Sequence, residues 1–123
     1  MNVAVIGASL NREKFGNKAL RAYIKNGDTV YPVNPNCVCT EIEGVPVYKS
    51  VKDIPGELDR ITIYLPPERT LTILEDMAKK GAKEIFLNPG SENSAVIKKS
   101  EKLGLNLYLA CSIIDIGFDP NNL

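Results

Sequence analysis

The stretch Asn2-Val-Ala-Val-Ile-Gly-Ala-Ser9 decides the fold that we expect for this chain. Val3, Val5 and Ile6 are β-branched and apolar, as is typical of a strand buried on both faces of a sheet. The strand leads directly into Gly-Ala-Ser, whose small side chains let another molecule approach the backbone closely. A helical pattern from about Gly16 to Asn26 would aim its free N–H groups and positive dipole end at this turn. Together these features predict an anion site, most often one for phosphate.

The same order of helix, glycine and strand recurs along the chain. Helical patterns end at Gly27, Gly81 and Gly104, and a β-rich run follows each glycine within a few residues. Glycine adopts the left-handed conformation that closes a helix, and the lysines before each glycine suit the negative helix end. This alternation is typical of parallel sheets covered by helices, and it argues against all-α and all-β domains.

We therefore predict an α/β protein with a three-layer, doubly wound, Rossmann-like fold around a five-stranded parallel sheet. Residues 1–123 are expected to form a single domain. The stretch from Cys37 to Pro55 has no regular pattern, apart from an extended piece at Gly44–Tyr48 and a helical turn capped by Ser50. Ser91 is predicted to cap the helix after the fourth strand.

Ligands of doubly wound sheets bind outside the carboxyl ends of the strands, near the point where strand order reverses. The residues expected after the five strands are small or turn-forming, and none of them is a carboxylate. They are Gly7, Ala8 and Ser9, then Asn34 and Pro35, Pro66 and Pro67, Asn88, Pro89 and Gly90, and finally Cys111 and Ser112. Arg12 and Lys14 follow the first of these turns and are candidates for phosphate contacts, although a solvated surface role is the ordinary one for such residues.

Composition limits the chemistry that this site can perform. The chain has 15 basic and 15 acidic residues, so it lacks the basic excess of a nucleic-acid or membrane-surface binder. It contains no histidine, which excludes histidine-based catalysis within the chain, and no carboxylate pair is placed for acid–base work. Three cysteines without a further soft ligand do not complete a zinc site. We expect neither catalytic residues nor metal ligands.

The remaining sequence signals concern location and cysteine chemistry. Met1 leads directly into a strand, and no apolar run approaches the length of a membrane span. We therefore expect a cytoplasmic protein with reduced thiols and no membrane partner. The pair Cys37 and Cys39 is interpreted as a chance spacing, and Cys111 as a small residue at a strand end that faces the cleft.

A nicotinamide dinucleotide is the first alternative ligand. Its sites normally combine the pattern G-x-G-x-x-G with an Asp or Glu after the second strand. Here Ala8 and Ser9 are followed by Leu10, and Asn34 stands where the acid is expected. These departures count against NAD(P), but an NAD(P)-binding module, either a redox sensor or an oxidoreductase fragment, stays open.

Motifs along nearly the whole chain, residues 2–112, resemble the CoA-binding domain family. They include V-I-G-A-S at residues 5–9, F-G-N at 15–17, Y-P-V-N-P at 31–35, G-V-P-V-Y at 44–48, and P-G at 89–90 with Cys111. The chain resembles the small stand-alone members and, more distantly, the CoA-binding domain of the succinyl-CoA synthetase alpha subunit. The synthetase's phosphohistidine lies in a separate domain, so the resemblance implies non-catalytic binding of coenzyme A or an acyl-CoA.

The resemblance also implies where CoA would lie. Its contacts in the synthetase correspond to Gly7–Leu10 and Leu87–Pro89 here. We expect the N–H groups of residues 7–9 to hold the pyrophosphate, and the turns after the second and third strands to shape the adenosine side. Cys111 and the turn after the fourth strand would border the pantetheine arm. A homo-oligomer, or a partner subunit that carries acyl-CoA chemistry, stays open. The complete set of expected ligand contacts is Gly7, Ala8, Ser9, Leu10, Arg12, Lys14, Asn34, Pro35, Pro66, Pro67, Leu87, Asn88, Pro89, Gly90 and Cys111.

Overall fold

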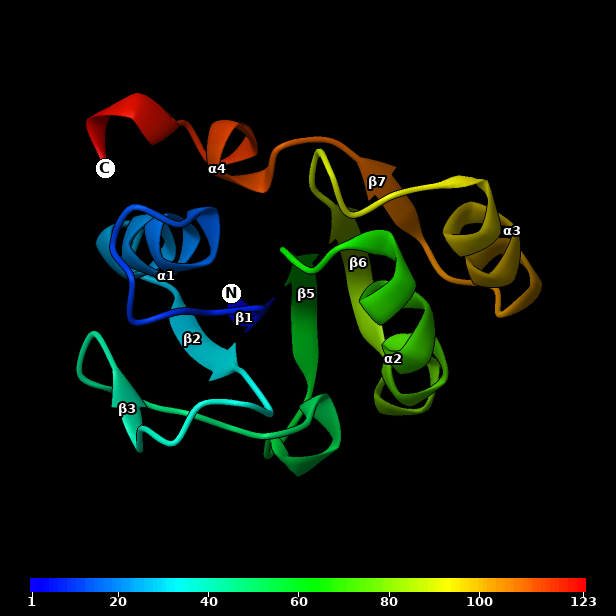
Figure 1. The fold of residues 1–123 in the computed structure, drawn as a ribbon, viewed down its shortest axis with the longest axis horizontal. Helices are drawn as coiled ribbons and strands as arrows, with labels where there is room; N and C mark the ends of the chain where they lie inside the picture. Colours follow the sequence, from blue (N-terminus) through cyan, green and yellow to red (C-terminus); the bar gives the residue numbers. More distant parts are fainter.

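The computed structural model describes residues 1–123, and five parallel strands form its main sheet (Figure 1). These strands are β1 (Asn2–Ile6), β2 (Thr29–Val33), β5 (Leu58–Ile63), β6 (Ala82–Leu87) and β7 (Leu107–Leu109). Their order across the sheet is β2-β1-β5-β6-β7, so the direction of winding reverses between β1 and β5. The predicted α/β, Rossmann-like fold with a five-stranded parallel sheet is confirmed.

Helices cover both faces of this sheet, and the side chains of β1 alternate between the two resulting cores. Val3 and Val5 are fully buried with residues of α1 (Phe15–Lys25) and α4 (Ser112–Asp115). Ala4 and Ile6 belong to the opposite core, with residues of α2 (Pro67–Lys80) and α3 (Ser94–Lys102). A strand covered on both faces needs apolar residues at consecutive positions, which explains the uninterrupted run V-A-V-I.

The helix ends follow the sequence signals, with one exception at the start of α3. Gly27, Gly81 and Gly104 each lie within two residues of a helix end, all with positive φ, as expected. Ser91, however, does not cap α3. Asn93 does so, because its Oδ1 accepts a hydrogen bond from Val96 N at 2.8 Å. The Ser91 hydroxyl is buried and donates instead to the carbonyl oxygen at the end of β5, 3.1 Å away.

A hairpin that the sequence did not reveal lies between β2 and β5. Its strands are β3 (Glu41–Ile42) and β4 (Val45–Pro46), which pair antiparallel around Glu43 and Gly44. Both turn residues have positive φ, 50° and 77°, as in the two-residue turns that suit hairpin twist. The expected extended piece therefore belongs to a hairpin, and the expected helical turn is η1 (Val51–Asp53), capped by Ser50.

The cysteines and the surface complete the description. Cys37 and Cys39 are joined by a disulfide, so the expectation of reduced thiols is wrong for this pair, whereas Cys111 is free. The loop folds back sharply enough to bring the two Cα atoms within 5.2 Å, inside the range that a disulfide requires. No helix combines the length and apolar content needed to cross a bilayer.

Candidate functional site

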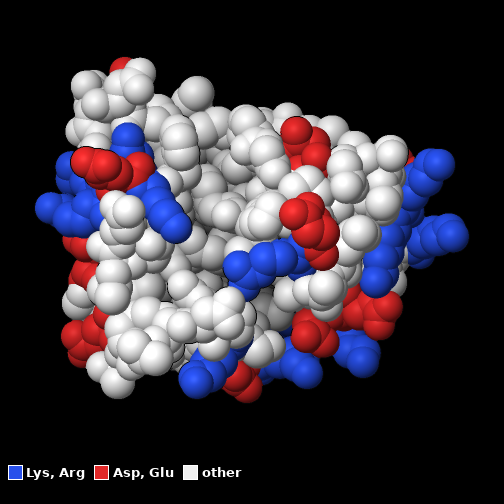
Figure 2. All heavy atoms as spheres, in the orientation of Figure 1, with Lys and Arg blue, Asp and Glu red and all other residues white.

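A cleft of about 630 Å³ opens at the carboxyl ends of the strands, where the order reverses between β1 and β5. Segments that follow all five strands of the main sheet contribute to its walls. Figure 2 shows a hollow on this face with an uncharged floor, and both basic and acidic side chains lie around it. The topology therefore brings together turns that are far apart in the sequence.

Most of the contacts expected from the sequence line this cleft. They are Gly7, Ala8, Ser9, Lys14, Asn34, Pro35, Pro66, Asn88, Pro89, Gly90 and Cys111. Four expected residues do not line it. Leu10 and Arg12 are exposed on the loop after β1, Pro67 begins α2, and Leu87 is fully buried in the core.

The cleft also has six lining residues that were not predicted: Phe15, Gly16, Tyr64, Leu65, Arg69 and Ser91. Tyr64 and Leu65 lie between β5, which ends at Ile63, and the expected turn at Pro66. Phe15, Gly16 and Arg69 lie in the first turns of α1 and α2. A helix that follows a parallel strand begins at the edge of the sheet where ligands bind. This general rule would have identified the residues in the first turns of α1 and α2 as lining residues.

Hydrogen bonds determine which N–H groups the turn after β1 can offer. Gly7 N and Ala8 N both donate to Val33 O, at 3.0 and 3.3 Å, because the end of β2 lies beside this turn. The expectation that the amides of residues 7–9 all hold a phosphate is therefore wrong for these two. The amides of Ser9, Phe15 and Gly16 have no partner within the protein and remain available to an anion.

Two asparagine side chains engage the carbonyl oxygens of the same turn. Asn34 Nδ2 donates to Ala8 O at 2.9 Å, and Asn17 Nδ2 donates to Ser9 O at 2.8 Å. A free carbonyl oxygen carries negative partial charge and would oppose an anion in the cleft. These bonds therefore make the turn more suitable for a negatively charged ligand.

Glycine is required where α1 meets the turn. A Cβ on Gly16 would lie 2.1 Å from Gly7 O, and a Cβ on Gly7 would lie 3.0 Å from Tyr64 O. Gly7 also has a φ of 85°, which a larger residue rarely adopts. Lys14 provides no side-chain cap, and the first turn of α1 contains no acid. The first turn of α1 itself therefore supplies no negative group to compensate the positive end of the helix beside the cleft.

The opposite wall rests on a buried polar network centred on Asn88. Its Nδ2 donates to Thr62 Oγ1 at 2.7 Å and to Ile63 O at 2.9 Å, and its Oδ1 accepts from Ser112 N at 2.8 Å. The Ser112 hydroxyl lies 2.6 Å from Thr62 Oγ1 and 3.0 Å from Tyr64 Oη. Burial raises the pKa of Tyr64, so its hydroxyl stays protonated near neutral pH. This network holds the neighbouring Cys111 at the cleft.

Charge in the cleft is positive although the whole chain is neutral. Lys14 and Arg69 are the charged lining residues, both are exposed, and neither forms an ion pair with an acidic side chain. No lining residue is a carboxylate. This lining suits a ligand with several negative charges, because it combines two cations, unpartnered N–H groups and a helix N-terminus. No group of three His, Cys, Asp or Glu residues is placed to hold a metal ion.

Comparison with known proteins agrees with this arrangement. Residues 1–116 match the CoA binding domain. The chain belongs to the CoA-binding domain family. This match confirms the family resemblance noted from the motifs. It covers all but the last seven of the 123 residues.

Curated relatives of this CoA-binding domain include subunits of much larger enzymes. The alpha subunit of ADP-forming acetate–CoA ligase II from Pyrococcus furiosus is 41% identical over 88 residues, which are 69% of this chain and 18% of the relative. The alpha subunit of ligase I from the same organism is 32% identical over 136 residues, which cover 99% of this chain and 29% of the relative. The chain thus spans less than a third of these relatives.

Solved structures contain the same fold both as nearly the whole of a protein and as one part of a larger protein. A conserved hypothetical protein from Pyrococcus furiosus superposes with a TM-score of 0.84 at 32% identity, covering 93% of this chain and 97% of that protein. Acetyl-coenzyme A synthetase 1 of Candidatus Korarchaeum cryptofilum, solved with phosphate and ADP, gives a TM-score of 0.76 at 27% identity. That match covers 89% of this chain and 25% of the synthetase.

Proposed function

We propose that this CoA-binding domain holds coenzyme A or an acyl-CoA in the cleft and performs no reaction on it by itself. The observation that carries the proposal is the set of unpartnered amides of Ser9, Phe15 and Gly16 at the start of α1, in a lining without carboxylates. CoA is a polyanion with a long neutral arm. It therefore matches a cleft whose two charged lining residues are both cations and whose floor is uncharged.

In the proposed arrangement, the pyrophosphate lies at Ser9 and Gly16, at the positive end of α1. The adenosine packs between the Asn34–Pro35 turn and Pro66, and the pantetheine arm follows Asn88–Gly90 towards Cys111. Lys14 and Arg69 supply positive charge from the two sides. The cleft volume, about 630 Å³, lies within the range of small-molecule sites.

Calorimetric titration with CoA, acetyl-CoA, NAD and NADP tests this function. We expect CoA or acetyl-CoA to bind more tightly than either nicotinamide cofactor. The absence of CoA and acetyl-CoA binding at hundreds of micromolar ligand would refute the proposal. Tighter binding of NAD or NADP would instead favour an NAD(P)-binding module, because all these ligands offer a pyrophosphate and differ in their remaining groups.

A partner subunit is the second element of the proposal. Two relatives are named as alpha subunits, and this chain spans less than a third of their length. We propose that acyl-CoA chemistry, where this protein takes part in it, is supplied by a separate chain. Purification of the tagged protein from its native cells should recover that chain in constant proportion. Recovery of this protein alone would contradict the second proposal and leave CoA binding untouched.

A further inference from the structure

Glu43 occupies an unfavourable backbone position at the tip of the β3–β4 hairpin. Its φ of 50° makes it the one non-glycine residue of the chain with positive φ. Turns of this kind favour Asn, Asp or Gly, because a longer side chain crowds the backbone there. A residue held in a costly conformation at a specific place suggests that its side chain performs a function.

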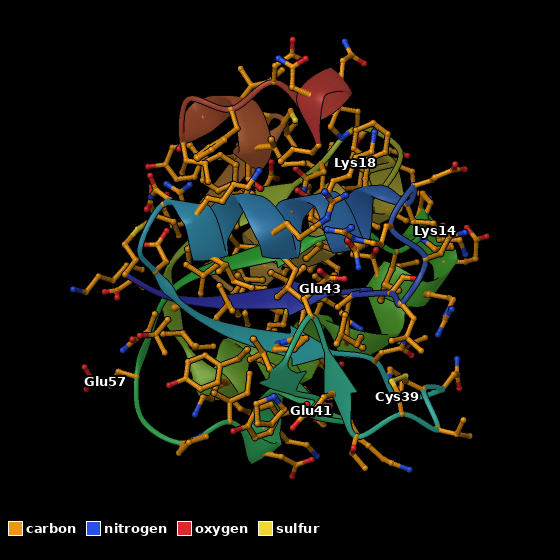
Figure 3. The ribbon with its side chains drawn as sticks, turned by 90° about the vertical axis from the view of Figure 1, so that its left-hand side faces the viewer. Lys14, Lys18, Cys39, Glu41, Glu43 and Glu57 are labelled. Carbon is orange, nitrogen blue, oxygen red and sulfur yellow. A yellow bond between two sulfur atoms is a disulfide. The ribbon has the colours of Figure 1, made fainter.

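The side chain of Glu43 reaches from the hairpin to the segment that leads into α1. Its Oε2 accepts a hydrogen bond from Asn17 Nδ2 at 3.2 Å and lies 3.5 Å from Arg12 Nε. Figure 3 shows Glu43 between the hairpin tip and α1, whereas Glu41 of the same hairpin lies farther from the helix. The Glu43 side chain is 23% exposed, against 65% for Arg12, so the contact with Asn17 is the better shielded of the two.

Asn17 connects Glu43 to the anion-binding turn. It is fully buried, and its Nδ2 donates both to Glu43 and to Ser9 O, while its Oδ1 accepts from Arg21 Nε at 2.7 Å. All the hydrogen-bonding groups of this side-chain amide are therefore satisfied, which fixes its orientation. Removal of the Glu43 acceptor would free one N–H and let the amide rotate away from Ser9.

We propose that Glu43 is a positioning residue of the anion site, which acts through Asn17 to hold Ser9 with its free amide towards the cleft. This inference rests on the proposed binding of CoA. Glu43 itself does not line the cleft, and its negative charge opposes an anion nearby. The hydrogen bond from Asn17 to Glu43 should raise the affinity for CoA, whereas the negative charge of Glu43 should lower it. Substitutions can separate these two effects.

The variants Glu43→Gln and Glu43→Asn form a matched pair. Both remove the charge, but glutamine keeps the length and an acceptor oxygen, whereas asparagine is one methylene too short to reach Asn17. We expect Glu43→Gln to bind CoA at least as tightly as the wild type. Glu43→Asn should bind about fivefold more weakly than Glu43→Gln, because the turn that carries the free Ser9 amide is no longer held in place and must be ordered when CoA binds.

Stability should not follow affinity. Glu43→Asn loses the bond to Asn17, but asparagine tolerates positive φ better than glutamine, so the two Glu43 variants should melt at similar temperatures. The side-chain amide of Asn17, which loses its Glu43 acceptor, should nevertheless exchange its hydrogens faster in Glu43→Asn, a readout that needs no ligand. Glu41→Gln and Glu41→Asn, on the same hairpin, should leave CoA affinity and the exchange of the Asn17 side-chain amide unchanged.

Equal CoA affinities and equal exchange rates of the Asn17 side-chain amide in the two Glu43 variants would overturn this inference. So would a loss of CoA binding in Glu43→Asn that accompanies a lower melting temperature, because a merely structural role would then suffice. If the wild type fails to bind CoA, the proposed function is refuted. The exchange of the Asn17 side-chain amide would then still decide whether Glu43 holds Asn17 in place.

Discussion

Gly16 shows how one missing methyl group shapes the site. An alanine Cβ would lie 2.1 Å from Gly7 O, so the backbone would have to shift. Alanine improves helix propensity by up to ~1 kcal/mol, whereas overpacking against backbone costs ~1–3 kcal/mol. The steric term is the larger, and we predict that Gly16→Ala lowers the free energy of unfolding in urea and weakens CoA binding.

Gly27→Ala is the control for this prediction. Gly27 has a φ of 87°, but nothing lies within 4 Å of the position of its Cβ, and it is not part of the cleft. It should therefore lose stability through backbone strain while keeping its affinity for CoA. Unchanged CoA binding in Gly16→Ala would show that α1 does not need its close approach to the turn.

Cys111 provides a chemical test of the orientation of the ligand. It is the free cysteine of the chain, it is half-buried, and it lines the cleft. If the pantetheine arm ends beside it, the Cys111 thiolate should attack oxidised CoA, form a mixed disulfide and release one CoA thiol. We predict that intact mass rises by one CoA moiety in the wild type and not in Cys111→Ser. An adduct that persists in this variant would contradict the placement of the thiol end beside Cys111.

At the scale of elements, the carboxylate of Asp59 links three strands near their amino ends. Asn2 N donates to Asp59 Oδ2 at 2.7 Å, which links β1 to β5, and Lys83 of β6 lies 3.3 Å from Asp59 Oδ1. The Asn2 N–H, and next the Lys83 ammonium, lower the pKa of Asp59 below its ordinary value of 3.8. The folded pKa is thus below the unfolded one, so this stabilisation is complete above the unfolded pKa and is lost as pH falls through the folded one.

We therefore predict that Asp59→Asn is less stable than the wild type at neutral pH and that this difference shrinks in acid. Urea unfolding between about pH 6 and pH 3 would measure it, since linkage confines the change to the range around the two pKa values. Glu57→Gln, an exposed neighbour without an ion pair, is the control. A difference that stays constant over this range would exclude a contribution from ionised Asp59.

The element scale also shows the limit of local patterns. Ser50 and the three helix-ending glycines were identified correctly, because a cap depends on residues close in the sequence. Ser91 was not, because its hydroxyl bonds to the end of β5, 28 residues away. The β3–β4 hairpin was missed because Glu43 is an unusual residue for a turn with positive φ.

At the scale of the whole molecule, a chain with no net charge concentrates positive potential in its cleft. Lys14 and Arg69 come from different elements, and only the fold places both on the cleft wall. We predict that CoA affinity falls several-fold between about 0.05 M and 0.5 M salt, because exposed charges are screened over these concentrations. The double variant Lys14→Gln, Arg69→Gln should bind more weakly and respond less to salt.

Lys98→Gln, Lys102→Gln is the matched control, because it removes two lysines of α3, which do not line the cleft. Its CoA affinity and salt response in calorimetry should equal those of the wild type. An identical salt response in the cleft double variant would show that these cations do not contact the ligand's phosphates. The binding energy would then come from the amides of α1 and from apolar contacts.

The sequence alone determined the Rossmann-like sheet, the edge of that sheet where a ligand would bind, and most of the residues that line the cleft. These follow from local preferences: β-branched runs form strands, glycines end helices, and small residues form the turns after strands. Only the tertiary structure decided which N–H groups remain free there. Val33 O takes the amides of Gly7 and Ala8, and Glu43 supports Asn17 from 26 residues away. An N–H group that donates to a carbonyl oxygen of the protein is no longer free for a ligand. Donors and acceptors this distant in the sequence come together only when strands and helices pack against one another.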